Sequence, residues 1–164
     1  MKRIGLISDT HGYFDGDIAN FFADCDEIWH AGDIGNVETL DYIKMYKPVR
    51  AVYGNIDGFE VRHECKEWLH FDCEGLGVFI THIGGYPGRY EYGIKELLLK
   101  LKPGLFISGH SHILKVINDK QLGLLHINPG AAGISGFHHV QTAVRFTVED
   151  GQPKDLEIWE KKRE

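Results

Sequence analysis

Seven residues along the chain have side chains that bind divalent metal ions. Each lies where an apolar run gives way to a glycine-containing loop, and together they are Asp9, His11, Asp33, Asn55, His82, His110 and His112. Parallel α/β proteins gather their functional groups in the loops beyond the carboxyl ends of the strands. We therefore expect these seven residues to meet in space.

The ligand types indicate which metals such a site would bind. The set contains two carboxylates, one amide and four imidazoles, and no thiolate. It favours Mn, Fe, Zn, Ni or Co over calcium, and seven ligands are too many for one ion. Two ions about 3.5 to 4 Å apart would share the Asp33 carboxylate, generate hydroxide near neutral pH and hold a phosphoryl group for in-line attack.

The motif from Gly109 to His112 is the strongest single signal. Two imidazoles one residue apart, entered through glycine from a buried strand, are uncommon outside metal sites. Taken alone, Asp33 could instead cap a helix and Asn55 could be a turn residue. The joint pattern at five strand ends is what favours a metal site.

The elements that must position these residues follow from the apolar pattern. Short apolar runs at 3–8, 27–30 and 49–53 are typical of buried parallel strands. Between them, Asp15 and Asn36 are expected to cap helices. The opening third of the chain is thus predicted to be a β-α-β-α-β unit.

Beyond this unit the predicted architecture becomes mixed. The runs at 68–71 and 78–81 indicate a hairpin, residues 90–102 a helix that ends before Pro103, and 105–108 a strand. The remaining strand-like runs are expected to form a second, antiparallel sheet, and they are 115–118, 122–127, 142–148 and 156–159.

Size and composition limit the class of protein. At 164 residues with 43% hydrophobic and 26% charged side chains, we expect one globular domain, residues 1–164. The chain has no apolar run long enough for a bilayer and no signal peptide, which favours a cytoplasmic protein without membrane contact. A net charge of −6 does not indicate nucleic-acid binding. The three cysteines lack zinc-knuckle spacing and are expected to be reduced.

The motifs together resemble a known family. Asp9-x-His11, Gly32-Asp33, Gly54-Asn55-x-Asp57, His82 and Gly109-His110-x-His112 resemble the five signature blocks of the calcineurin-like metallophosphoesterases. The segment 127–130 also resembles one in the small YfcE-type phosphodiesterase branch. The resemblance implies an α/β fold, a metallophosphoesterase-like four-layer αββα sandwich of two mixed β-sheets flanked by helices. It also implies that Asp9, His11, Asp33 and His112 hold one ion, while Asp33, Asn55, His82 and His110 hold the other.

The function implied is that of a di-metal-dependent phosphoesterase, more specifically a phosphodiesterase, in which a metal-bridging hydroxide attacks in line. Manganese is the first expectation, with Ni, Zn, Fe or Co as alternatives, and the substrate would be a small phosphate ester. We predict as catalytic residues Asp33, Asn55, His82 and His110. Relatives of this size often form dimers or tetramers, so a homodimer or homotetramer is compatible with the resemblance.

Two other functional classes stay open. The retromer complex contains a subunit of this fold that serves mainly as an interaction surface, so a catalytically weak or inactive scaffold is the alternative. A zinc hydrolase of non-phosphate esters is less well supported, because an Asp-bridged site with an asparagine suits phosphoryl oxygens better.

Several further residues could support the site. Many family members place a histidine directly after the Gly-Asn pair, where it protonates the leaving group, whereas this chain has Ile56. We therefore expect a preference for acidic leaving groups. Arg89 is a candidate for steadying the substrate phosphate, although a surface role is the alternative.

Three polar residues near the motifs complete the set of candidates. His138 could contact substrate or donate a proton, or it could belong to an exposed histidine pair with His139. We expect His30 to donate or accept a hydrogen bond to a ligand. Asp57 is expected to orient an imidazole or to stabilise a turn.

Overall fold

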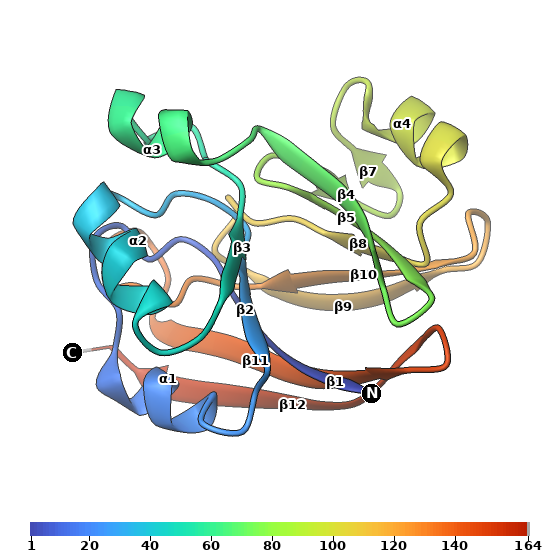
Figure 1. The fold of residues 1–164 in the computed structure, drawn as a ribbon. Helices are drawn as coiled ribbons and strands as arrows, with labels where there is room; N and C mark the ends of the chain where they lie inside the picture. Colours follow the sequence, from blue (N-terminus) through green and yellow to red (C-terminus); the bar gives the residue numbers. More distant parts are fainter. Residues whose placement is uncertain (164) are drawn as a thin grey trace.

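Two five-stranded β-sheets lie face to face, with helices on their outer surfaces (Figure 1). This arrangement is seen in a computed structural model that describes residues 1–163. The first sheet has the order β12-β11-β1-β2-β3, and its strands are β1 (Lys2–Ile7), β2 (Glu27–His30), β3 (Val49–Ala51), β11 (Val140–Glu149) and β12 (Gln152–Lys162). The second has the order β4-β5-β8-β10-β9, and its strands are β4 (Trp68–Cys73), β5 (Leu76–Thr81), β8 (Leu105–Ile107), β9 (Leu114–Asp119) and β10 (Leu124–Pro129).

Both sheets are mixed, as predicted. β1 runs parallel to β2, and β2 parallel to β3, so the predicted β-α-β-α-β opening is confirmed. In the second sheet β8 is parallel to both β5 and β10. The carboxyl ends of β1, β2 and β3 therefore share one edge of their sheet, and those of β5 and β8 share an edge of the other.

Side-chain caps define the two helices of the opening. α1 (Gly16–Phe21) is capped by Asp15, which accepts a hydrogen bond from the Asp17 backbone N–H at 2.8 Å. α2 (Val37–Lys44) is capped by Asn36, which accepts from Thr39 N–H at 2.8 Å. Both caps were predicted, because Asp and Asn side chains satisfy the free N–H groups of a first helical turn.

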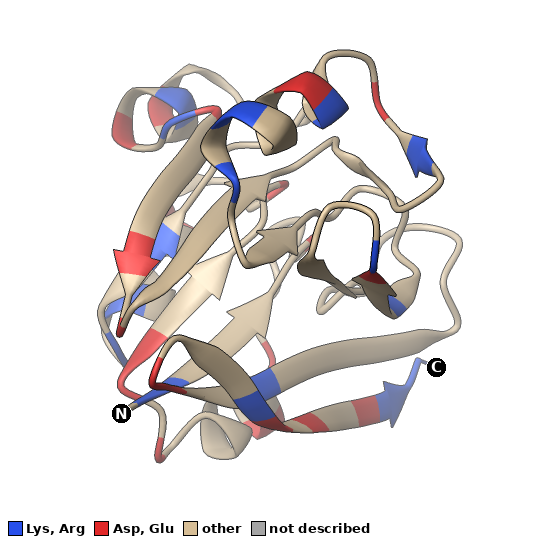
Figure 2. Cartoon of the chain, turned by 90° about the vertical axis from the view of Figure 1, so that its right-hand side faces the viewer, with Lys and Arg blue, Asp and Glu red and all other residues tan. Residues whose placement is uncertain are grey.

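The prediction that the last strands all belong to a second sheet is wrong for β11 and β12. β11 pairs antiparallel with β1, opposing Phe146 to Ile4, and thereby joins the first sheet. Alternating apolar residues tell which strand faces are buried but do not specify the partner strand. β12 is the outer strand of that sheet and carries charged side chains of both signs, which protect an exposed edge (Figure 2).

Two helices also differ from the prediction. α4 (Ile94–Leu101) begins later than residue 90, because β6 (Gly85–Tyr86) and β7 (Arg89–Tyr90) form a small hairpin before it. α3 (Phe59–Glu64) was not predicted. It has six residues and buries only Val61, so it has no apolar period to detect.

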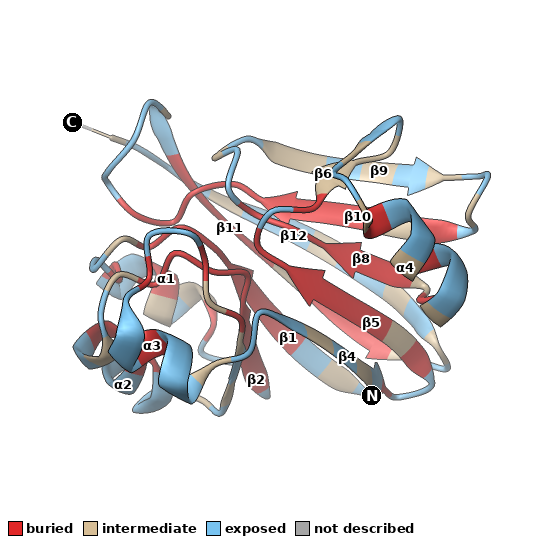
Figure 3. Ribbon diagram, turned by 90° about the horizontal axis from the view of Figure 1, so that it is seen from above, coloured by how far each residue is buried: buried red, intermediate tan, exposed pale blue. Residues whose placement is uncertain are grey.

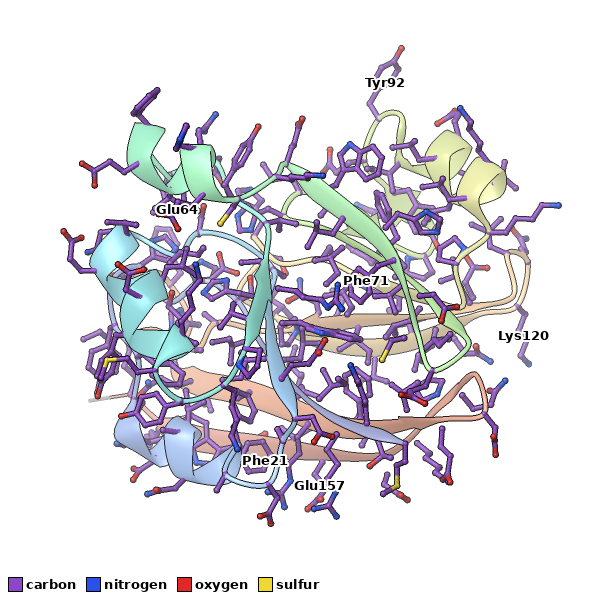
Figure 4. All side chains as sticks on the ribbon, in the orientation of Figure 1. Phe21, Glu64, Phe71, Tyr92, Lys120 and Glu157 are labelled. Atoms are coloured by element: carbon purple, nitrogen blue, oxygen red, sulfur yellow. The ribbon has the colours of Figure 1, made fainter. Side chains whose placement is uncertain are left out.

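The core lies between the two sheets, and smaller clusters lie beneath the helices. The strands of both sheets are buried where they face each other (Figure 3). The Trp29 ring packs edge-to-face on Phe71, which is labelled in Figure 4, at 5.1 Å and on Phe146 at 5.8 Å. On the outer faces, Ile18 of α1 packs on the first sheet and Leu98 of α4 on the second. Within residues 1–163, no helix combines the length and apolar character needed to cross a bilayer.

Asp57 ties together two of the loops at the shared strand edge. Its buried carboxylate accepts hydrogen bonds from the backbone N–H groups of Gly54 at 2.8 Å, Gly35 at 2.8 Å and Ile34 at 3.1 Å. The carboxylate therefore orders the loop after β3 against the loop after β2. No imidazole of residues 1–163 hydrogen-bonds to it, so of the two expected roles the structure supports stabilisation of a turn.

Replacing Asp57 by alanine should lower the free energy of unfolding by about 3 kcal/mol, because two buried N–H groups and one partly buried N–H group would lose a charged acceptor. Urea denaturation of the metal-free protein measures this change. Asp24→Ala is the matched control, since the Asp24 side chain is 84% exposed and should change stability by less than about 0.5 kcal/mol. Equal stability of the two variants would contradict the role given to Asp57.

Candidate metal centre

The seven predicted residues converge at the carboxyl ends of five strands. Asp9 and His11 follow β1, Asp33 follows β2, Asn55 follows β3, His82 follows β5, and the two remaining histidines follow β8. Six of them form two groups whose ligand atoms lie within 4.8 Å of one another: Asp9, His11 and His112 in one, and Asp33, His82 and His110 in the other. The structure thus brings together residues more than 100 positions apart.

The Asp33 carboxylate lies between the two groups. Its Oδ2 atom is 3.1 Å from His82 Nε2, within its own group, and 3.5 Å from His11 Nε2, within the other. Asp9 Oδ1 is 3.2 Å from His112 Nε2 and 3.7 Å from His11 Nε2. These two oxygens, Asp33 Oδ2 and Asp9 Oδ1, therefore each face imidazole nitrogens from more than one loop.

Three buried polar atoms at this centre have no hydrogen-bond partner. They are Asp9 Oδ1, His11 Nε2 and His82 Nε2, and the fourth such atom within residues 1–163, His126 Nε2, lies elsewhere in the core. Buried polar groups are normally paired, since an unpaired group costs about 1–3 kcal/mol. Asp9 Oδ1 lies 3.7 Å from His11 Nε2 and 3.8 Å from His82 Nε2, and unpaired oxygen and nitrogen atoms this close together fit divalent cations.

The protonation of His82 supports the same interpretation. Its Nδ1 atom lies 2.7 Å from the backbone carbonyl of Ala31, which can only accept, so Nδ1 carries the proton. In the neutral ring, Nε2 then presents a lone pair to the Asp33 carboxylate at 3.1 Å. Two acceptors at this distance require a proton or a metal ion between them.

The electrostatics of the centre favour ionised carboxylates. Burial alone would raise the pKa of Asp9, but the neighbouring imidazoles of His11 and His112 outweigh it and lower the pKa well below its usual range. Burial also opposes ionisation of Asp33, yet the neighbouring His82 imidazole lowers the pKa. The Asp9 carboxylate beside it raises the pKa of His11. The centre therefore attracts positive charge, as protons or as metal ions.

Backbone strain is concentrated at the same residues. Nine non-glycine residues of the described chain have positive φ, and five of them are Asp9, His11, Asp33, His110 and His112, with φ between 46° and 72°. Such conformations are uncommon for non-glycine residues and cluster at functional sites. At the third loop, glycine is required instead, because a Cβ atom at Gly54 would collide with the Asp33 carboxylate.

Asn55 lies where two cavities meet at the centre. It lines a cavity of about 460 Å³ together with His11, Asp33 and both histidines of the loop after β8. It also lines a smaller cavity of about 240 Å³ together with His82. Asn55, which is exposed, therefore lies on the surface shared by the cavities of both histidine groups.

Ser8 is a positioning residue that the sequence analysis missed. Its hydroxyl donates to Asp9 Oδ2 at 2.7 Å, and the backbone N–H of His110 donates to the same oxygen at 3.1 Å. These bonds occupy Oδ2 and leave Oδ1 directed at the other ligands. The only sequence signal was a hydroxyl side chain directly before the aspartate.

Asn128 orders the histidine loop, a role that the sequence analysis also missed. Its Nδ2 group donates to the Gly109 carbonyl at 3.0 Å and to Ser111 Oγ at 3.1 Å. The segment around it was recognised only as a motif. No local pattern indicated that its amide would reach the loop after β8.

His138 contacts the centre through His112. Its Nε2 atom lies 2.7 Å from the Gly133 carbonyl and therefore carries the proton, while Nδ1 lies 3.0 Å from His112 Nδ1. Burial lowers the pKa of His138, which favours the neutral ring. His138 Nδ1 must then accept a hydrogen bond from His112 Nδ1–H, so that His112 Nε2 is the atom directed at Asp9, with a lone pair when the ring is neutral.

His30 has other hydrogen-bond partners than the sequence analysis expected. His30 does not hydrogen-bond to a side chain of the seven within the described chain; instead it accepts from Gly32 N–H at 3.1 Å and contacts Thr10 Oγ1 at 2.9 Å. Complete burial lowers the pKa of His30 to about 4, so the ring is neutral and orders the loops. The expected bond to a ligand is therefore wrong.

Arg89 is not brought to the centre. The hairpin of β6 and β7 directs it into a separate cavity that it lines with Tyr92 and Asp119, and Tyr92 points outward at the edge of the molecule (Figure 4). None of the seven predicted residues lines that cavity. The hairpin, which was not foreseen, is the physical reason for the difference.

Comparison with known proteins agrees with this geometry. Two archaeal proteins named as probable metallophosphoesterases are similar to the chain. That of Methanothermobacter thermautotrophicus is 30% identical over 165 residues, covering 94% of this chain and 90% of the relative. That of Methanocaldococcus jannaschii is 32% identical over 152 residues, covering 90% and 76%.

A solved structure shares the fold. The crystal structure of Vps29 from Entamoeba histolytica complexed with zinc is superimposable with a TM-score of 0.76 at 15% identity, covering 98% of each chain. Residues 1–151 match the family model of the calcineurin-like phosphoesterase superfamily domain. This match, the similarity to the archaeal proteins and the two mixed sheets between helices agree with one another. The chain belongs to the calcineurin-like phosphoesterase superfamily.

Proposed function

We propose that this protein is a two-metal phosphodiesterase that hydrolyses small phosphate diesters. The observation that supports the proposal most directly is the set of buried, unpaired atoms of Asp9, His11 and His82, in which Asp9 Oδ1 lies 3.7 Å from His11 Nε2 and 3.8 Å from His82 Nε2. All seven ligand residues of the family's pattern are present in this chain. Buried charge of this kind costs folding free energy unless positive charge compensates it, which bound metal ions would supply.

In the proposed division of ligands, Asp9, His11 and His112 would hold one ion and His82, His110 and Asn55 the other, with Asp33 shared. Two such ions would supply a nucleophile near neutral pH and positive charge for the phosphoryl oxygens. Manganese is the first candidate, and Ni, Zn, Fe and Co suit the same ligands.

Hydrogen bonds with neighbouring residues would orient the ligand atoms toward the metal ions. His82 donates to the Ala31 carbonyl and so directs Nε2 at the site. Asp33 Oδ1 accepts from Ile56 N–H at 3.0 Å, which leaves Oδ2 directed toward the imidazoles of both groups. Ser8 performs the same task for Asp9. Of these residues we propose Asp33, Asn55, His82 and His110 as catalytic.

The alternative is a protein-interaction scaffold with weak or no catalysis, and the likeness in fold to Vps29 is what supports it. We further propose that residues 1–164 act as one domain, because both sheets contribute to a common core. A cytoplasmic location and a homodimeric or homotetrameric state complete the proposal.

The metal proposal predicts that protein loaded with Mn²⁺ hydrolyses bis(p-nitrophenyl) phosphate. Asp33→Ala should reduce kcat/KM by at least about 1000-fold, since both ions would lose a ligand. Elemental analysis should find about two ions per chain in the wild type and fewer in the variant. Asp24→Ala is the control at an exposed aspartate. Full activity of Asp33→Ala would exclude the mechanism, and a protein that stays metal-free and inactive while binding a fixed partner would favour the scaffold.

The leaving-group proposal concerns Ile56, which stands where many relatives have a proton-donating histidine. Wild-type protein should hydrolyse an aryl diester far faster than dimethyl phosphate, because an alkoxide needs a proton and a nitrophenolate does not. Ile56→His should raise the rate for the alkyl diester by about 100-fold relative to the rate for the aryl diester. Steady-state kinetics on both diesters measure this, and equal wild-type rates would contradict the proposal.

The positioning proposal concerns His138. His138→Ala should weaken Mn²⁺ binding by about 10- to 100-fold, since His112 would lose the acceptor that fixes its tautomer. His138→Asn should restore much of the affinity, because the amide oxygen can accept where Nδ1 did. Isothermal titration calorimetry measures the affinity, with His139→Ala as the neighbouring control. Unchanged affinity in His138→Ala would disprove the role.

A further inference from the structure

One wall of the larger cavity at the centre is apolar and open to solvent. Ile56, Ile113 and Phe137 line this cavity together with the ligand residues, and we call these three side chains the apolar rim. They are exposed by 46%, 56% and 100%, respectively. Large apolar side chains grouped at the opening of a cavity are typical of ligand-binding sites.

The loop that carries Phe137 is fixed against the centre. Arg163 Nη1 donates to the carbonyls of Ile134 and Gly136, each at 2.9 Å. On the other side of Phe137, His138 bonds to His112 and to Gly133. The loop is therefore anchored on both sides of Phe137, and this anchoring holds the Phe137 side chain in an exposed position.

Gly136 brings this loop close to a predicted metal ligand. Its φ is +130°, and a Cβ atom at this position would lie 2.5 Å from the His112 ring. Only glycine permits such an approach. The next residue, Phe137, therefore lines the cavity of the site and does not lie on a distant surface.

The charge of the cavity limits what it can bind. Within residues 1–163, no lysine or arginine lines the cavity with the apolar rim, and the whole chain has a net charge of −6. The metal ions would be the main source of positive charge and would be neutralised by the reacting phosphoryl group. A second phosphate or a nucleic-acid backbone on this side would lack a counter-charge.

The smaller cavity on the other side of Asn55 differs in character. Arg62 and Glu67 line it, and Arg62 donates to the Asp57 carbonyl at 2.6 Å. Tyr53 and Ile83 also line it, so the lining of this side mixes charged and apolar side chains, whereas no lysine, arginine or glutamate of the described chain lines the side with the apolar rim. A diester with two different substituents would be oriented by this asymmetry.

We propose that the apolar rim is a subsite for an uncharged aromatic ring, such as a nucleobase or an aryl group, carried by one substituent of a phosphodiester. The inference rests on the proposed phosphodiesterase function and specifies its substrate class. An aromatic ring can pack on Phe137 and against the isoleucine side chains while its phosphate reaches the ligand residues. The volume of about 460 Å³ accommodates a ligand of that size.

The test compares two ligands that differ only in the ring. Phenylphosphonate and methylphosphonate carry the same phosphonate group, and their binding to Mn²⁺-loaded protein can be measured by calorimetry without turnover. The wild type should bind phenylphosphonate about tenfold more tightly, and Phe137→Ala should reduce this preference to less than about threefold. Phe59→Ala is the matched control, since Phe59 is 83% exposed on α3 and lines neither cavity.

Kinetics separate failure of the subsite from failure of the function. Phenyl p-nitrophenyl phosphate and methyl p-nitrophenyl phosphate have the same leaving group, so Phe137→Ala should lower kcat/KM about tenfold for the first only. Turnover with equal ring preference in wild type and Phe137→Ala would overturn the subsite and leave the phosphodiesterase intact. Ring-selective binding without turnover of any diester would support the subsite and overturn the function. A wild type that binds neither phosphonate would overturn the subsite.

Discussion

Two buried carboxylates, those of Asp9 and Asp33, face the same imidazole nitrogens, and this electrostatic arrangement governs the rest of the structure. Both lie within 3.8 Å of the Nε2 atoms of His11 and His82. Burying two negative charges side by side is costly unless positive charge lies between them. The fold must therefore bring imidazoles to this point and must leave room for cations among them.

That requirement explains the hydrogen bonds around the centre. One oxygen of each carboxylate is occupied by donors, Ser8 and His110 N–H for Asp9 and Ile56 N–H for Asp33. The other oxygen is left for the site. Imidazole tautomers are fixed in the same way, through the carbonyl of Ala31 for His82 and through His138 for His112. The ligand atoms of Asp9, Asp33, His82 and His112 are thus each directed by a hydrogen bond to a group outside the set of ligand atoms.

The loops bear the conformational cost of this arrangement. Five of the seven predicted ligands have left-handed backbone conformations, which the surrounding hydrogen bonds must hold in place. Asp57 contributes by joining the loops after β2 and β3, and His30 by bonding to Gly32 and Thr10. The large core between the sheets keeps the strand ends rigid. Stability elsewhere in the fold therefore maintains a strained and highly charged centre.

The sequence by itself determined the strands of the opening unit, both helix caps and the identity of the converging residues. These features depend on local patterns: apolar runs, a polar cap residue, and ligand-type side chains after a strand. Only the tertiary structure decided which sheet β11 would join, because the alternation that buries Phe146 does not name its partner. It also decided that Asp57 binds three backbone N–H groups, that Arg89 lies outside the centre, and that His138 reaches His112. Those outcomes depend on where separate loops meet, and no local pattern of residues specifies that distance.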